Sequence, residues 1–302
     1  MSFTSVHFLF LFFPVVLFLY YLLPSRGWRS LILVISSLVF FAWADPQHLH
    51  VLLASVLFNY FFGIMISHAR NRGKPGIRKL LMWAAVIINI LILGFYKYLG
   101  LLGESIFETL NLQIDLTRRI LPLGISYFTF SGISYIMDVY HGIEKPEKNV
   151  LRFTSFLVMF PKLLQGPITR YKDVKNELLD SKIVTGNLAV GVRRLVIGLA
   201  KKVILANSLA VASEKVFSAD PARLGAGAAW FGLIAFTLEI YFDFSGYTDI
   251  AIGIGMFAGI HLPENFANPY LKTNITAFWN SWHITLAQWF RSYVFNPLTR
   301  SL

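Results

Sequence analysis

Residues 241–297, YFDFSGYTDIAIGIGMFAGIHLPENFANPYLKTNITAFWNSWHITLAQWFRSYVFNP, decide how this chain folds. The stretch opens as an apolar segment long enough to cross a bilayer, yet it contains Asp243 and Asp249, and Glu239 lies just before it. Acidic side chains at membrane depth are costly, and a sequence that keeps them usually has a function for them. We therefore expect a functional site here, with the upstream segments forming a cavity around it.

The same stretch is interrupted in its middle. The apolar pattern breaks at His261-Leu262-Pro263, resumes through Thr273-Asn274, and leads into an aromatic-rich segment that contains His283. A cap among residues 273–276 predicts a helix that holds His283 within its first turns. A neutral imidazole in a mostly apolar cavity can act as a general base on a hydroxyl group. The alternative is a histidine that only hydrogen-bonds at a helix interface.

The composition indicates an all-α polytopic membrane protein. Of the 302 residues, 56% are hydrophobic and 14% are charged, and the mean hydropathy is +0.59. About a quarter of the residues in a soluble domain are charged. The apolar runs are continuous and have the length of a membrane-spanning helix, whereas a membrane β-barrel would show alternating strands. We predict one integral domain over residues 1–302, with spans near 3–23, 28–44, 49–67, 79–99, 121–140, 151–168, 188–212 and 226–258, and a further helix starting near 275.

The formal net charge is +11. Basic residues gather in the short loops 24–30 and 68–80, whereas the loop between them carries Asp45. This pattern places the two basic loops in the cytoplasm and the amino terminus outside, and it indicates contact with a bilayer and not with nucleic acid. The chain has no cysteine, which excludes thiolate catalysis and Cys-ligated metals within it.

Two proline-glycine sites predict irregular backbone in the membrane. In LPLGIS at 121–126, the proline is predicted to initiate a helix. The segment FPKLLQGP at 160–167 is predicted to interrupt a span before Arg170. Such backbone is tolerated where it is buried in protein or lines water, so we expect some re-entrant helices.

The acidic residues leave several roles open. Glu239 and Asp243 are four residues apart and share a helix face, and Asp249 follows them. They could bind a cation, orient His283, or hydrogen-bond to unwound backbone. We favour orientation or structural bonding, because carboxylates without a convergent set of histidines are weak metal sites, and we predict no metal.

The order of these motifs resembles the membrane-bound O-acyltransferase family. The likeness rests on FDFSGYTDIAIGIGMFAGIHLPENFANPY and FWNSWHITLAQWFRSYVFNPL, and upstream on FLFLFFPVVLFLYYLLP, ILGFYKYLG, LPLGISYFTFSGISYIMDVYHG and FPKLLQGPITRYKDV. It is closest to the family's bacterial branch of alginate O-acetyltransferases. Other members of this branch O-acetylate peptidoglycan or D-alanylate teichoic acid.

The resemblance implies a bundle of transmembrane and re-entrant helices around a central funnel, in the bacterial inner membrane. The implied reaction moves an acyl group, acetyl by likeness, from a cytoplasmic thioester such as acetyl-CoA or an acyl carrier. The acceptor would be an exported polysaccharide or a periplasmic partner protein, and no bound cofactor is implied.

The resemblance also implies roles for individual residues. His283 matches the histidine of the family's Trp-His motif and would be the catalytic base. Asn280 or Trp282 would stabilise the oxyanion. The remaining candidates for lining the funnel or orienting its groups are Glu239, Asp243, Asp249 and Arg170.

The chain departs from the family pattern at three places. Asn280-Ser281 stand where the family usually has two arginines, and Arg291-Ser292-Tyr293 replace the Arg-Asp-Tyr of alginate members. The family's second histidine, in a Leu-Trp-His-Gly motif, is absent from residues 1–302. We therefore expect a truncated chain that is inactive alone. A non-catalytic membrane subunit and a transporter or flippase of a glycan-modification system are the alternative functions.

Overall fold

The computed structural model describes residues 2–109, 121–180 and 185–300, and every regular element within those ranges is helical. Five helices there are long and apolar enough to cross a membrane: Arg26–Ala44, Pro46–Asn71, Pro75–Tyr98, Leu188–Phe217 and Ala226–Phe257. A shorter apolar helix covers Phe8–Leu22. The predicted all-α, multi-pass membrane architecture is therefore confirmed.

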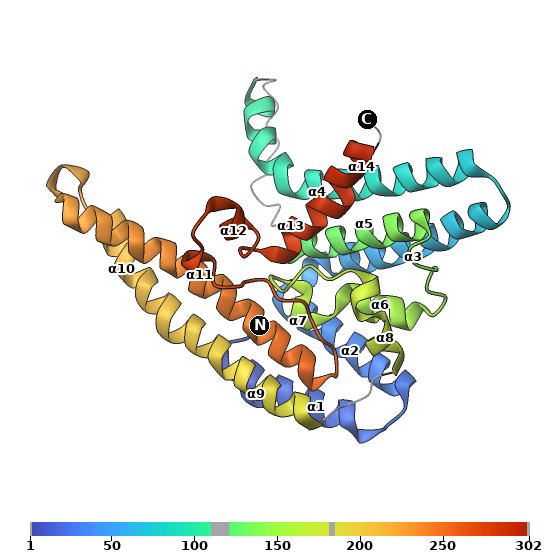
Figure 1. Ribbon diagram of the computed structural model, residues 1–302, viewed down its shortest axis with the longest axis horizontal. Coiled ribbons are helices and arrows are strands. Elements are labelled where there is room, and N and C mark those ends of the chain that lie inside the picture. The colour runs from blue at the N-terminus through green and yellow to red at the C-terminus, as the bar shows by residue number, and fades with distance from the viewer. Residues whose placement is uncertain (1, 110–120, 181–184, 301–302) are drawn as a thin grey trace. The chain divides into compact units, whose positions relative to one another are not determined.

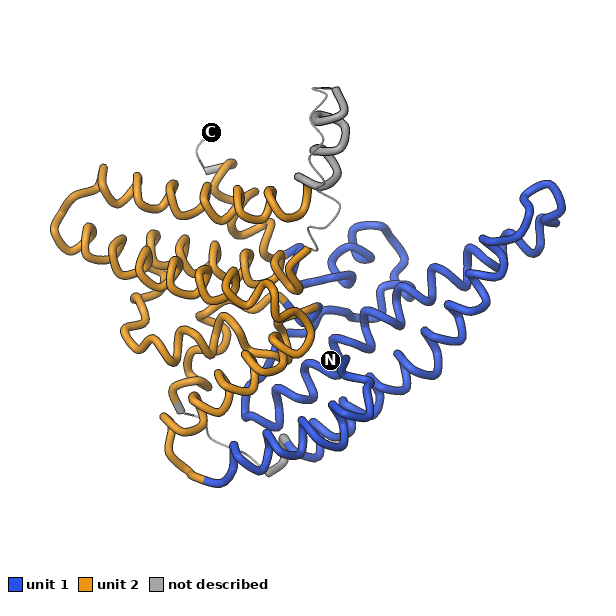
Figure 2. Tube along the Cα trace, turned by 180° about the vertical axis from the view of Figure 1, so that it is seen from behind, with its two compact units in different colours: residues 1–22, 165–167, 181–287 blue, residues 23–164, 168–180, 288–302 orange. Residues whose placement is uncertain are grey.

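The chain falls into two compact units that are interleaved in sequence (Figure 2). Unit 1 contains residues 1–22, 165–167 and 181–287, and unit 2 contains residues 23–164, 168–180 and 288–302. The single integral domain over residues 1–302 stays a prediction.

Unit 2 is built on three helices that pack against one another, α3 (Leu49–Asn71), α4 (Pro75–Thr109) and α5 (Ile125–His141) (Figure 1). The buried side-chain amides of Asn59 in α3 and Asn89 in α4 exchange two hydrogen bonds, of 3.0 and 3.3 Å. A reciprocal pair of this kind satisfies two polar groups at once in surroundings that offer few other partners. The pair therefore fixes how α3 and α4 face each other.

Further elements complete unit 2. They are α2 (Arg26–Ala44), η2 (Pro46–His48), α6 (Val150–Val158), α7 (Phe160–Leu163), α8 (Tyr171–Asp180), η6 (Arg291–Phe295) and α14 (Asn296–Arg300). Side-chain caps start two of them, because Ser25 accepts from the Trp28 amide and Asn149 accepts from the Arg152 amide.

Two predictions about proline sites in unit 2 need correction. The span expected over 151–168 is two short helices, because α6 ends at Val158 and α7 has only four residues. Pro161 lacks an amide donor and its ring does not fit a helix interior, so it stands at the start of α7. The prediction that Pro122 initiates a helix is wrong, since α5 begins after Gly124, whose φ of 67° is left-handed.

Unit 1 is dominated by a helical hairpin. One arm joins α9 (Thr185–Leu199), the π-helical turn η3 (Ala200–Ala206) and α10 (Asn207–Phe217), and the other is α11 (Ala226–Phe257) (Figure 1). The arms approach closely at glycines, since a Cβ atom on Gly246 would lie 2.9 Å from the Gly198 carbonyl oxygen. Small residues at helix interfaces allow such close backbone packing in membranes. The approach brings the charged side chains of both arms within bonding distance.

The remaining parts of unit 1 lie before and after the hairpin. The amino-terminal helix η1–α1 (Phe8–Phe12 and Phe13–Leu22) is tied to the end of α11, because the Tyr20 hydroxyl donates to the Ala258 carbonyl at 2.8 Å. After α11 come the turn η5 (Pro269–Leu271), α12 (Ile275–Trp279) and the start of α13 (Ile284–Phe290); the hairpin loop holds η4 (Pro221–Arg223).

Candidate active site

His283 lies in the turn between α12 and α13, outside the five long helices. Asn274 caps α12 as predicted, since its side-chain oxygen accepts from the Ala277 amide at 2.8 Å. The helix has only five residues, however, so His283 does not lie within its first turns, and that prediction is wrong. Its carbonyl instead accepts from the amides of Leu286 and Ala287, which places His283 at the start of α13.

The backbone of His283 is in an unusual conformation. Its φ is +43°, in the left-handed region that residues with a β-carbon rarely occupy. A residue keeps this conformation only where the surrounding structure enforces it, and such residues cluster at functional sites.

A second segment of unit 1 enforces the turn. The Ile284 amide donates to the Asn265 carbonyl at 3.0 Å, and the Ala267 amide donates to the Ser281 carbonyl at 3.0 Å. The buried Asn265 side chain also accepts from the amide and the hydroxyl of Thr285, at 3.2 and 2.9 Å. Two of these bonds use the amides of Ile284 and Thr285, which follow His283, and one uses the Ser281 carbonyl. These groups are therefore not available to continue α12 through His283.

The imidazole of His283 is half-buried against an aromatic ring. Its ring centroid lies 4.8 Å from that of Phe244, edge to face. Burial lowers the pKa of His283 to about 4, so the ring is neutral at physiological pH. Among the described residues, its buried Nε2 atom has no hydrogen-bond partner. A neutral imidazole with an unsatisfied nitrogen is a group that can accept a proton from a hydroxyl.

Aromatic side chains surround this turn. Trp282 packs against Phe266 at 5.1 Å and stacks on Phe278 at 5.8 Å, and Phe266 in turn contacts Phe244 at 5.1 Å. Trp282 is thus part of an aromatic cluster beside His283. Asn280, the other candidate for oxyanion stabilisation, is exposed at the end of α12.

A charged pocket of about 290 Å³ lies within unit 1. It is lined by Arg194, Ile197, Lys201, Tyr241, Ser245, Thr248, Asp249, Glu264, Phe266 and Asn268. Asp249 accepts from Arg194 at 2.7 Å and from Lys201 at 2.6 Å, and Arg194 also bonds to Glu264. His283 does not line this pocket, but Phe266 lines it and packs on Phe244, which contacts His283.

The three predicted carboxylates have separate partners. Asp249 belongs to the charged pocket, Asp243 bonds to Lys202, and Glu239 accepts from the Ser213 hydroxyl at 2.6 Å. Glu239 and Asp243 do share a face, because both reach the opposite arm of the hairpin. In the described ranges no hydrogen bond joins any of the three to His283. Lysine and arginine of that arm bond to Asp243 and Asp249, and a serine hydroxyl bonds to Glu239.

One further candidate residue can be placed. Arg170 belongs to unit 2, where its guanidinium makes two hydrogen bonds of 2.9 Å with Asp173. That carboxylate raises the pKa of Arg170. Within the described part of the chain, no group of three or more His, Cys, Asp or Glu side chains is placed to hold a metal ion.

Sequence reasoning missed the basic half of the charged pocket. Arg194 and Lys201 are seven residues apart in an apolar segment, a spacing that puts both on one helix face. Charged residues in a span need partners, so this pair could have been matched to Asp249. For Asn265, no sequence pattern indicated its role at the turn that carries His283.

Comparison with known proteins identifies the protein family. The sequence profile described as "MBOAT, membrane-bound O-acyltransferase family" matches residues 144–302, more than half of the chain, including the turn that carries His283. The chain belongs to the membrane-bound O-acyltransferase family.

Individual relatives refine this placement. The chain is 38% identical over 302 residues to the probable alginate O-acetylase AlgI of Pseudomonas syringae, covering 99% of the chain and 57% of the relative. It is 34% identical over 339 residues to a peptidoglycan O-acetyltransferase of Helicobacter pylori, covering 98% and 61%. It is 30% identical over 271 residues to a teichoic acid D-alanyltransferase of Bacillus subtilis, covering 86% and 65%. The chain therefore spans about six tenths of the length of these relatives.

Proposed function

We propose that this chain is the membrane part of an O-acyltransferase that esterifies an exported glycan, with His283 as the base. The proposal rests on one observation above all. Within the family-matched region, His283 is held in a left-handed turn with a neutral ring and an unsatisfied buried Nε2. The names of the relatives support acyl transfer to a cell-envelope polymer, and the acetyl group is favoured by the alginate and peptidoglycan relatives.

The proposed reaction is an acyl exchange between sulfur and oxygen. The Nε2 atom of His283 takes the proton of the acceptor hydroxyl as its oxygen attacks the thioester carbonyl. The tetrahedral intermediate then collapses, the carbon–sulfur bond breaks, and the thiolate takes the proton from the imidazolium. The products are an ester and a free thiol. Trp282 and Asn280 are the proposed donors to the oxyanion.

The surroundings of His283 suit this chemistry. Proton transfer to nitrogen needs a neutral ring, and burial keeps the pKa of His283 well below neutrality. We assign to the aromatic cluster of Phe244, Phe266 and Trp282 the role of limiting access of water, which would hydrolyse a thioester. The proposed donor is a cytoplasmic thioester, acetyl-CoA or an acyl carrier, and the proposed location is the bacterial inner membrane.

The proposal is tested by the chemistry of the glycan that cells export. A strain that lacks the gene is compared with one restored by the full-length protein, and base-labile acetate and total glycan are both measured. An acyltransferase predicts that the gene-deleted strain exports the glycan at normal yield without its esters. Loss of the glycan itself would favour the transporter, and unchanged esters would refute the acyltransferase.

A further inference from the structure

A second pocket lies in unit 2, at the amino-terminal ends of two helices. It has a volume of about 200 Å³ and is lined by Arg26, Gly27, Ser30, Asn149, Leu151, Arg152, Leu178 and Leu179. α2 contributes the first three residues, α6 and its cap contribute the next three, and α8 contributes the two leucines. The volume is below the roughly 300–1,000 Å³ of pockets for drug-sized ligands, so the pocket suits one small group.

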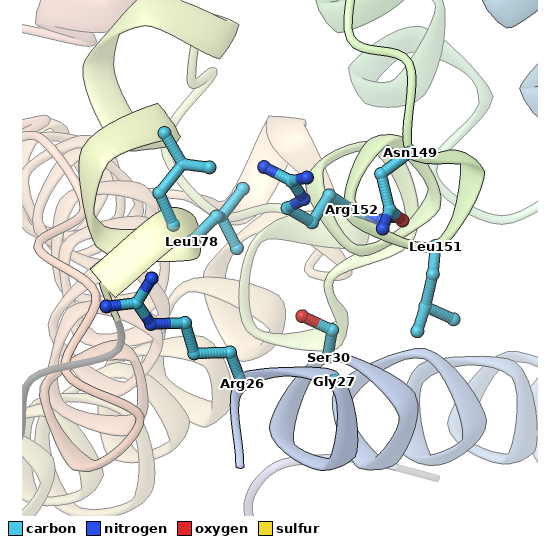
Figure 3. A pocket seen from close by; sticks show the side chains of 8 residues that line it. Arg26, Gly27, Ser30, Asn149, Leu151, Arg152 and Leu178 are labelled. Carbon is cyan, nitrogen blue, oxygen red and sulfur yellow. Dashed lines mark hydrogen bonds between the residues drawn. The ribbon is translucent and has the colours of Figure 1, made fainter.

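Each polar side chain that lines this pocket can donate a hydrogen bond. Figure 3 shows the side chains of Arg26 and Arg152 entering it from α2 and α6. The side-chain oxygen of Asn149 already accepts from the Arg152 amide at 3.1 Å, so its NH₂ group is what it can offer to a ligand. No acidic side chain lines the pocket among the residues that the structure describes.

Arg152 is only partly neutralised. Its Nη1 atom lies 3.6 Å from the Glu147 carboxylate, farther than a hydrogen bond. Glu147 already accepts from the Tyr171 hydroxyl at 2.5 Å and from the Asn149 amide at 2.7 Å. The guanidinium of Arg152 therefore keeps donors that an anion in the pocket can use.

The backbone adds to the positive potential. α2 has 19 residues and α6 has nine, and both begin at this pocket. The first amides of a helix have no carbonyl partner within it, and the helix dipole favours an anion at that end. The two arginines and the amino-terminal ends of the two helices therefore all favour an anion in this pocket.

We propose that this pocket binds a phosphate group. Two guanidinium groups in one small pocket match the planar, multidentate recognition of phosphate. The three leucines would contact the apolar part of the molecule that carries it. The carrier can be an anionic lipid of the adjacent leaflet or a soluble phosphorylated molecule of the cytoplasm, the side to which the basic loop 24–30 is predicted to face. This inference does not depend on the proposed acyltransferase function.

Gly27 offers a test that does not remove a structural side chain. A Cβ atom added there would meet no other atom within 4 Å, so a side chain at this position enters open space. Gly27→Glu puts a carboxylate at the pocket, and Gly27→Ala adds only a methyl group as its control. Arg152→Gln removes one guanidinium. Arg223→Gln removes the same charge from a side chain that is 89% exposed in unit 1, and is the matched control.

The experiment uses the purified full-length protein in two arms. In the first, nanodiscs of phosphatidylcholine are titrated with inorganic phosphate at constant ionic strength, and the shift in unfolding temperature gives the affinity. In the second, nanodiscs with and without phosphatidylglycerol are dissolved in detergent, and native mass spectrometry counts the retained anionic lipid.

The expected result is specific to the pocket. Arg152→Gln and Gly27→Glu should weaken phosphate binding, or lipid retention, by about tenfold, whereas Gly27→Ala and Arg223→Gln should match the unmodified protein. An effect in the first arm identifies a soluble phosphate source, and an effect in the second alone identifies a lipid. If neither probe distinguishes Arg152→Gln and Gly27→Glu from the two controls, the proposal is wrong.

Discussion

The side-chain oxygen of Asn265 accepts two hydrogen bonds from Thr285, one from its amide at 3.2 Å and one from its hydroxyl at 2.9 Å. Thr285 is two residues after His283, so this contact fixes the start of α13 and with it the left-handed turn at His283. The catalytic geometry that we propose therefore depends on a residue 18 positions away in sequence.

Replacement of Asn265 should uncouple this turn from the rest of unit 1. Asn265→Ala removes the acceptor for two buried donors and should cost about 2 kcal/mol of unfolding free energy. Asn265→Asp keeps the acceptor oxygen and should retain most of the ester formation that Asn265→Ala loses. The check is glycan ester content per amount of protein in the membrane. Equal ester content in the two variants would show that this contact does not position His283.

The burial of His283 predicts a pH dependence of stability. Its pKa is about 4 in the folded protein, against an ordinary value near 6.5 in the unfolded chain. Between these values the unfolded state binds more protons, so stability is present above about pH 6.5 and is lost as the pH falls towards 4. His283→Gln removes this contribution. The unfolding temperature of the unmodified protein should therefore fall relative to that of His283→Gln between pH 7 and pH 4.5. If the two proteins give parallel curves of unfolding temperature against pH, the burial of His283 is contradicted.

Replacement of Asp249 in the charged pocket should lower the stability of the protein strongly, and a second substitution should restore part of it. Asp249→Asn leaves Arg194 and Lys201 close together without their shared carboxylate, and should cost about 3 kcal/mol. Glu264 still pairs with Arg194 in that variant, so adding Lys201→Met removes the one uncompensated positive charge and should restore part of this loss.

The matched control for that prediction is Asp220→Asn in the exposed pair with Arg223, whose atoms lie 3.6 Å apart. It should change stability by less than about 1 kcal/mol. The free energy of unfolding of each variant is measured in mixed micelles, as the fraction of a denaturing detergent is increased. Equal effects at Asp249 and Asp220 would show that the pocket does not hold the hairpin together.

Membrane orientation is predicted from the basic loops and can be measured directly. Residues 1–302 contain no cysteine, so single cysteines can be introduced there, in a full-length background from which any further cysteine has been removed. Ser2→Cys should react with an impermeant maleimide added outside, whereas Lys74→Cys should react only after the membrane is permeabilised. The reverse labelling pattern would overturn the orientation and would move the proposed phosphate pocket to the outer face.

The sequence was sufficient to predict what depends on hydropathy and local capping. The long apolar runs at 28–44 and 226–258 correspond to α2 and α11, and Asn274 caps α12 as expected. The start of α5 was misplaced because a left-handed Gly124 and a helix-initiating Pro122 give the same local pattern.

The site was predicted less completely, since its geometry depends on contacts between distant segments. His283 was expected in an aromatic-rich segment, where the structure places it, but it was expected inside a helix. The break before it is made by Asn265, which sequence spacing does not connect to it. The partners of Asp249 were missed for the same reason, because Arg194 and Lys201 reach it across the hairpin.

The most direct test of the account compares two histidines of unit 1. His283→Ala and His261→Ala are expressed as full-length proteins at equal levels in cells that lack the gene, and the ester content of the exported glycan is measured. His261 is exposed in the loop after α11 and has no role in the proposed reaction. If His283 is the base, His261→Ala restores the esters and His283→Ala does not. Full restoration by His283→Ala would show that His283 is not the base of the transfer reaction.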